Sequence, residues 1–96
     1  MERLDAEHEL SRLREAIDRV DEVLVKLLNQ RAKYAVQIGE IKGHLSLPVY
    51  SPEREKEVLR HVEEASQGPL DGPSVRRLFE RIIDESRRVE RESATK

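Results

Sequence analysis

One stretch, residues 10–42, constrains the fold of this 96-residue chain more than any other part. Its apolar residues are spaced alternately three and four apart, no proline interrupts it, and one glycine, Gly39, stands near its end. This spacing predicts a long α-helix with a single apolar seam. The seam consists of Leu10, Leu13, Ile17, Val20, Leu24, Leu27, Tyr34, Ile38 and Ile41.

Arg31 occupies the seam position that follows Leu27. A lone cation in an apolar row costs several kcal/mol unless an anion neutralises it. The sequence therefore predicts an anion beside Arg31. Gly39 has two interpretations that the sequence leaves open: a tolerated weak point, which costs about 1 kcal/mol relative to alanine, or a place where another backbone or a ligand comes close.

The predicted helix is longer than a globular domain of this size. A compact chain of 96 residues has a diameter of about 32 Å, whereas a helix over residues 10–42 extends about 50 Å at about 1.5 Å per residue. The overhanging part of the seam needs cover from another chain, and small domains assemble most often as symmetric dimers. We therefore predict an intimate homodimer.

Composition narrows the classes of function. The 18 Lys and Arg residues are interleaved with 20 Asp and Glu residues, for a net charge of −2, which argues against a nucleic-acid or membrane surface. The sequence has neither a membrane-spanning run nor a signal peptide, so we expect a cytoplasmic protein. Without cysteine and without a metal, nucleotide or nucleophile motif, neither a metal nor a cofactor is predicted.

Two shorter helices are predicted after the long one. Gly43 is expected to end the first helix, and Ser51 to cap the second, with Pro52 at its first position. A turn-rich segment then leads to the third helix, for which Asp71 is the expected cap. The prediction is an all-α fold in one domain, residues 1–96, with helices over about 5–42, 52–66 and 72–92.

Each predicted helix carries polar residues where its apolar pattern continues. Arg31 and Lys42 are nearly three turns apart, so they point the same way about 16 Å from each other and suit a compact polyanion. Arg14 faces a different direction and would reach the same ligand only from a partner chain. Taken singly, such residues are more often solvated or salt-bridged, but their convergence favours a ligand site between helices. The remaining members of the set are Arg54, Glu55, Ser86 and Glu90.

Three segments resemble, in order, the helices of the all-helical chorismate mutase family, including the mutase domain of bifunctional chorismate mutase/prephenate dehydratase proteins. They read LREAIDRVDEVLVKLLNQRAKYAVQIGEIK, PVYSPEREKEVL and RLFERIIDESRRVE. The resemblance covers about residues 10–90. It implies an intertwined homodimer and an isomerase that rearranges chorismate to prephenate without a cofactor, in phenylalanine and tyrosine biosynthesis.

The resemblance also implies a role for each residue of the set. Arg31 and the partner's Arg14 would bind the two carboxylates of chorismate, and Lys42 would reach a carboxylate and the ether oxygen. Because charge develops on that oxygen, Lys42 is expected to contribute the largest electrostatic term. Glu55 and the backbone N–H of Ser51 would bind the ring hydroxyl. Ser86 and Arg54 would complete and orient the pocket.

Glu90 departs from the best-known members of the family, which have glutamine beside the ether oxygen. A glutamate can donate a hydrogen bond there only when it is protonated. We therefore expect turnover to fall as pH rises through neutrality, and Glu90→Gln to flatten the pH profile.

Two other functions remain open at this point. An isochorismate pyruvate lyase resembles these mutases and uses a similar cationic pocket, although Glu55 favours the mutase because it supplies a partner for the ring hydroxyl. A non-catalytic helical dimerisation or regulatory module would need the seam alone. Assays with chorismate and isochorismate separate the enzymes from each other and from the module.

Overall fold

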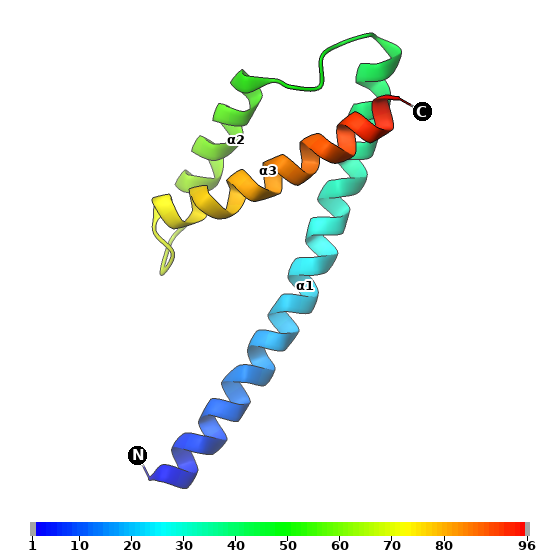
Figure 1. The fold of residues 1–96 in the computed structure, drawn as a ribbon. Coiled ribbons are helices and arrows are strands. Elements are labelled where there is room, and N and C mark those ends of the chain that lie inside the picture. The colour runs from blue at the N-terminus through cyan, green and yellow to red at the C-terminus, as the bar shows by residue number, and fades with distance from the viewer. Residues whose placement is uncertain (1, 96) are drawn as a thin grey trace. The chain divides into compact units, whose positions relative to one another are not determined.

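The computed structural model describes residues 2–95, which form three α-helices and no strand. Helix α1 spans Arg3–His44, α2 spans Pro52–Ala65 and α3 spans Gly72–Ala94 (Figure 1). The all-α prediction is confirmed. No helix in this described range is both long enough and apolar enough to cross a membrane.

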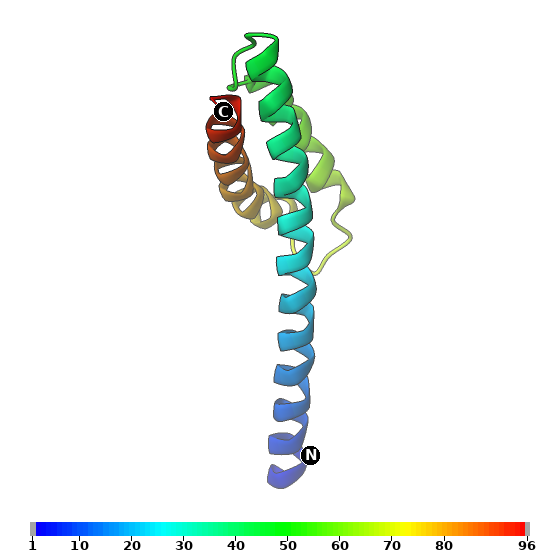
Figure 2. The ribbon, with the colours of Figure 1, turned by 90° about the vertical axis from the view of Figure 1, so that its right-hand side faces the viewer.

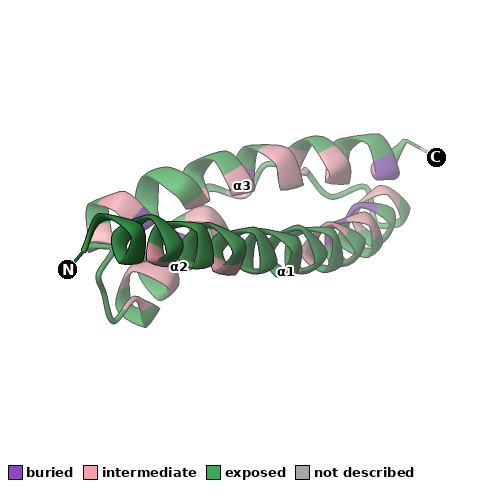
Figure 3. Cartoon of the chain, turned by 90° about the horizontal axis from the view of Figure 1, so that it is seen from below, coloured by how far each residue is buried: buried purple, intermediate pink, exposed green. Residues whose placement is uncertain are grey.

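The chain divides into two compact units, one that ends at Arg31 and one that begins at Ala32. The described part of the first unit is the N-terminal part of α1, which is coloured as exposed along most of its length in Figure 3. Its large apolar residues are exposed. Ile17, for example, is 58% exposed and Leu24 is 49% exposed. The apolar seam of this unit is therefore not covered within the unit itself.

The second unit holds the last turns of α1 together with α2 and α3. Figures 1 and 2 show α3 beside the C-terminal turns of α1, and α2 packs against α3. Its apolar core is small, as the composition requires, and consists of Ala35, Leu59, Val75 and Ile83. Tyr34, Ile38 and Ile41, the seam residues of this unit, stay exposed, so α1 meets α3 through a different face.

That face is made of small residues. A Cβ atom added at Gly39 would lie 2.8 Å from the Cα of Glu90, and one added at Gly43 would lie 2.9 Å from the Cα of Ala94. Both distances are too short for a side chain, so the backbones of α1 and α3 touch at two points one helical turn apart. Of the two interpretations of Gly39, the close approach of another backbone is the one confirmed.

The prediction that Gly43 ends the first helix is wrong. Gly43 lies inside α1 because the α3 backbone packs on it, and α1 continues to His44. The helix is closed instead by Ser46, which has a φ of 54°. Leu47 N donates to Lys42 O at 2.8 Å and Ser46 N to Gly43 O at 3.3 Å, the pattern of a Schellman motif with serine at the position where glycine is usual.

The starts of α2 and α3 follow the predictions only in part. Ser51 stands at the N-cap of α2 and Pro52 follows it, but the Ser51 side chain makes no capping hydrogen bond. Asp71 does cap α3, since its Oδ1 accepts from Ser74 N at 2.8 Å. Hydrogen bonding from the Ser74 side chain, and then from its backbone N–H, lowers the pKa of the Asp71 carboxyl.

Candidate functional site

Among the charged residues of α3, Arg87 and Glu90 are three positions apart and are therefore neighbours on the helix surface. Each forms an ion pair with a different helix of the second unit. Glu90 pairs with Lys42 of α1, and Arg87 pairs with Glu55 of α2. We call these four residues, two on α3 and their two partners on α1 and α2, the polar face of α3.

Lys42 connects α1, the loop before α2, and α3. Its Nζ donates to Glu90 Oε1 at 2.8 Å and to the carbonyl oxygen of Val49 at 2.9 Å. The Lys42 and Glu90 side chains are 20% and 16% exposed, so this pair is shielded more than the surface pairs of the chain. Gly39 and Gly43 flank Lys42 in α1, and their contact with the α3 backbone holds the ammonium group close to Glu90.

Glu55 and Arg87 form a fork-shaped pair between α2 and α3. Arg87 Nη2 donates to both carboxylate oxygens at 2.7 Å, and Nε donates to Oε2 at 3.1 Å. The guanidinium carbon lies 5.1 Å from the centre of the Tyr50 ring, within the range of a cation–π contact. Hydrogen bonding to Glu55 raises the pKa of Arg87 above its ordinary value.

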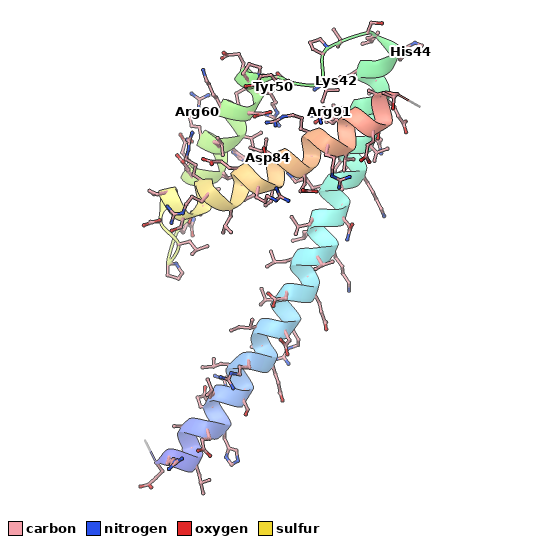
Figure 4. All side chains as sticks on the ribbon, in the orientation of Figure 1. Lys42, His44, Tyr50, Arg60, Asp84 and Arg91 are labelled. Atoms are coloured by element: carbon pink, nitrogen blue, oxygen red, sulfur yellow. The ribbon has the colours of Figure 1, made fainter. Side chains whose placement is uncertain are left out.

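The structure thus brings together Lys42 with Glu90, and Glu55 with Arg87, a residue that the sequence prediction did not include. One signal for Arg87 was present: it lies one turn beyond Ile83 and three residues before Glu90, on the same stripe of the helix. Tyr50 was also missed, because it lies in an irregular loop where no periodicity marks it. Figure 4 shows Tyr50 on that loop and Lys42 on α1.

Other predicted residues lie elsewhere. Arg54 is on the exposed side of α2 and pairs locally with Glu57 at 3.3 Å, because one residue along a helix turns the side chain by about 100° from Glu55. Ser51 is half-buried and its carbonyl accepts from Glu55 N at 3.1 Å. Ser86 is half-buried on α3. In the first unit, Arg14 is exposed and Arg31 is half-buried.

The chemistry available on the polar face is electrostatic. An ammonium group has three N–H donors, and the contacts of Lys42 with Glu90 and Val49 engage two of them. Glu90 acts here as an acceptor. Among residues 2–95 no cluster of three or more His, Asp or Glu side chains is placed to hold a metal ion. The groups present suit the binding of an oxygen-rich anion and the stabilisation of charge on its oxygens.

Comparison with known proteins assigns the chain to a family. The family model described as chorismate mutase type II matches residues 13–91, a range that contains all eight predicted site residues. The chain belongs to the chorismate mutase type II family. The resemblance found in the sequence is therefore confirmed.

Individual relatives agree with this assignment. Over 78 residues the chain is 47% identical to the bifunctional chorismate mutase/prephenate dehydratase of Neisseria gonorrhoeae, covering 81% of this chain and 21% of that protein. The chain thus spans about a fifth of the length of this curated relative.

Two solved mutases share the fold. The chorismate mutase of Thermus thermophilus (form II) superposes with a TM-score of 0.83 at 33% identity, covering 85% of this chain and 93% of that one. The chorismate mutase of Helicobacter pylori in complex with prephenate also has a TM-score of 0.83, at 28% identity, and covers 93% and 97% of the two chains.

Proposed function

We propose that this chain is a chorismate mutase, an isomerase that converts chorismate to prephenate in phenylalanine and tyrosine biosynthesis. The observation that carries the proposal is the placement of Lys42, whose ammonium group is shielded and held by Glu90 and Val49 O. Family membership supports it, and so does a relative of the same fold that was solved in complex with prephenate.

The reaction is a unimolecular rearrangement, so the protein acts by holding the reactive conformer and by stabilising the charge that develops on the ether oxygen. No cofactor or covalent intermediate enters the proposed mechanism. Lys42 donates to the ether oxygen and to a carboxylate of the substrate. Arg31 and the partner's Arg14 bind the carboxylates.

The remaining residues position the ring. Glu55 and the backbone N–H of Ser51 bind the ring hydroxyl, and Ser86 and Arg54 complete the pocket. For Arg54 this proposal requires a rotation away from Glu57, its hydrogen-bond partner. The Arg54–Glu57 pair is exposed, with side chains 69% and 56% accessible, so breaking it costs little.

Glu90 is proposed to donate to the ether oxygen, and this role requires a proton. Its Oε1 accepts from Lys42 Nζ, so donation to the ether oxygen requires a protonated carboxyl group that is turned toward the substrate. A chorismate assay across pH with the wild type and with Glu90→Gln tests this role. A wild-type profile that is flat from about pH 5 to about pH 8 would exclude it.

We also propose that the active form is an intertwined homodimer in which a second copy covers the apolar seam. The seam residues of α1 are about half exposed in the single chain, and a contiguous exposed apolar surface of this kind marks an interaction site. A second copy is the proposed occupant because a two-fold axis pairs the same surface of both subunits and because the proposed site needs the partner's Arg14.

The test is an assay of the purified chain with chorismate and, separately, with isochorismate. Formation of prephenate from chorismate is the expected result. Formation of pyruvate from isochorismate alone would assign a lyase. No turnover of either compound, together with an intact dimer, would leave the helical dimerisation module as the function.

A further inference from the structure

The Glu55–Arg87 pair has a geometry that ordinary surface ion pairs lack. Three N–H···O contacts of 2.7–3.1 Å join the guanidinium to both oxygens of one carboxylate. The two side chains are 25% and 26% exposed. Such a fork restrains both the position of the carboxylate and its rotation, which a single contact does not do.

Arg87 is itself held by its surroundings. Tyr50 lies under the guanidinium carbon at 5.1 Å, and Asp84, one turn earlier on α3, approaches Nη1 at 3.4 Å. Glu55 and Asp84 are the acidic groups that contact it, one from α2 and one from its own helix. The guanidinium is therefore anchored on three sides, and Glu55 takes its orientation from that anchor.

We propose that Arg87 is a positioning residue that orients the Glu55 carboxylate as the acceptor for the ring hydroxyl of the substrate. This inference rests on the proposed mutase function. An ionised carboxylate has about four lone-pair sites, so Glu55 can accept from a hydroxyl while Arg87 holds it. Arg87 does not touch the substrate and acts only through Glu55.

This role makes a particular kinetic prediction. The ring hydroxyl takes no part in the bond rearrangement, so its contact with Glu55 stabilises the bound substrate and the transition state alike. Loss of such uniform binding raises KM and leaves kcat nearly unchanged. A loss of the Lys42 contact, by comparison, lowers kcat because that contact strengthens in the transition state.

The experiment compares Arg87→Met, Arg87→Lys and the control Arg88→Met in steady-state turnover of chorismate. Arg88 is the next residue on α3, is 54% exposed, and forms local pairs with Glu85 and Glu92. Arg87→Met is expected to raise KM about tenfold and to keep kcat within about twofold of the wild-type value. The rise in KM is moderate because the Glu55–Arg87 hydrogen bonds are partly exposed and solvent weakens them. Arg87→Lys keeps the charge without the fork and should give an intermediate KM. Arg88→Met should resemble the wild type.

Two further measurements test the route through Glu55. In a Glu55→Gln background, Arg87→Met should raise KM by much less than tenfold, because the two residues act as a unit. A chorismate analogue with hydrogen in place of the ring hydroxyl should show the same KM with the wild type and with Arg87→Met. A purely structural effect of Arg87 would raise KM for both substrates and would add to the effect of Glu55→Gln.

The outcomes separate the two proposals. An active wild type with unchanged KM in Arg87→Met, or with equal effects on chorismate and on the analogue, overturns the positioning role and leaves the mutase function standing. A wild type without turnover overturns both. If circular dichroism shows that Arg87→Met does not fold, Arg87→Lys is measured instead. A ratio of the KM values for chorismate and the analogue that equals the wild-type ratio overturns the positioning role.

Discussion

The two units of this chain use the same kind of helix in opposite ways. Up to Arg31, α1 carries large apolar side chains that remain exposed. From Ala32 on, the same helix buries the small residues Ala35 and Gly39, and Gly39 lies against the α3 backbone. The difference shows that α1 has two contact faces, a small-residue face that packs within the second unit and an apolar seam that neither unit covers by itself.

Charge is also used differently in the two units. Ion pairs of the first unit, such as Arg3–Glu7 and Arg12–Glu9, link neighbouring turns of one exposed helix and contribute little to stability. In the second unit Lys42–Glu90 and Arg87–Glu55 join different helices and are mostly shielded. Shielded pairs between helices fix the relative placement of polar groups, which is the requirement of a binding site.

The largest effect is expected for Leu24→Glu, which places a charged side chain in the apolar seam of α1. If a second copy covers the seam, a buried charge there prevents dimerisation, and turnover falls below detection because the partner's Arg14 is lost. Light scattering measures the mass and a chorismate assay the activity. Lys26→Gln is the matched control, since Lys26 is exposed on another side of the same helix. An unchanged mass in Leu24→Glu would show that the seam is not the dimer interface.

Lys42→Met tests whether the shielded cation of the second unit takes part in catalysis. Removal of one preorganised donor to a developing oxyanion lowers kcat by roughly 100-fold to 1,000-fold, while the dimer should persist. Lys33→Met is the control, because Lys33 is exposed on the opposite side of α1. Equal activity in both variants would remove Lys42 from the mechanism.

Gly39→Ala probes the small-residue face. The added Cβ would lie 2.8 Å from the Cα of Glu90, so α1 and α3 must move apart, at a cost of about 1–3 kcal/mol in the free energy of unfolding. Thermal and urea unfolding measure this loss. At Gly72 the nearest atoms would be 4.0 Å away, and Gly72→Ala should leave stability unchanged or slightly higher. Equal stability of the two variants would contradict the close packing.

The smallest effect is expected for Asp71→Ala, which removes the cap of α3. The pKa of Asp71 is lowered in the folded chain by hydrogen bonding to Ser74, so its contribution is fully present above the ordinary Asp value and is lost as pH falls through the lowered one. The melting temperature of Asp71→Ala should be a few degrees below that of the wild type at about pH 7. This difference in melting temperature should become smaller in strong acid. A difference in melting temperature that does not change with pH would exclude a charged cap at Asp71.

Local patterns in the sequence were sufficient for much of the fold. The three-and-four spacing of the seam predicted a long helix, and Pro52 and Asp71 marked the starts of the next two, because capping and periodicity depend on residues a few positions apart. The same patterns placed Lys42 and Glu90 among the polar residues on apolar faces. That these two residues meet is consistent with the predicted ligand site.

Only the tertiary structure decided which faces meet. Gly43 was expected to end α1 because glycine favours helix ends, yet the close approach of Ala94 keeps it inside the helix. The fork between Arg87 and Glu55 joins residues 32 positions apart, a separation on which periodicity carries no information. Helix formation is governed by neighbours along the chain, whereas the partner of a charged side chain is governed by how the helices pack.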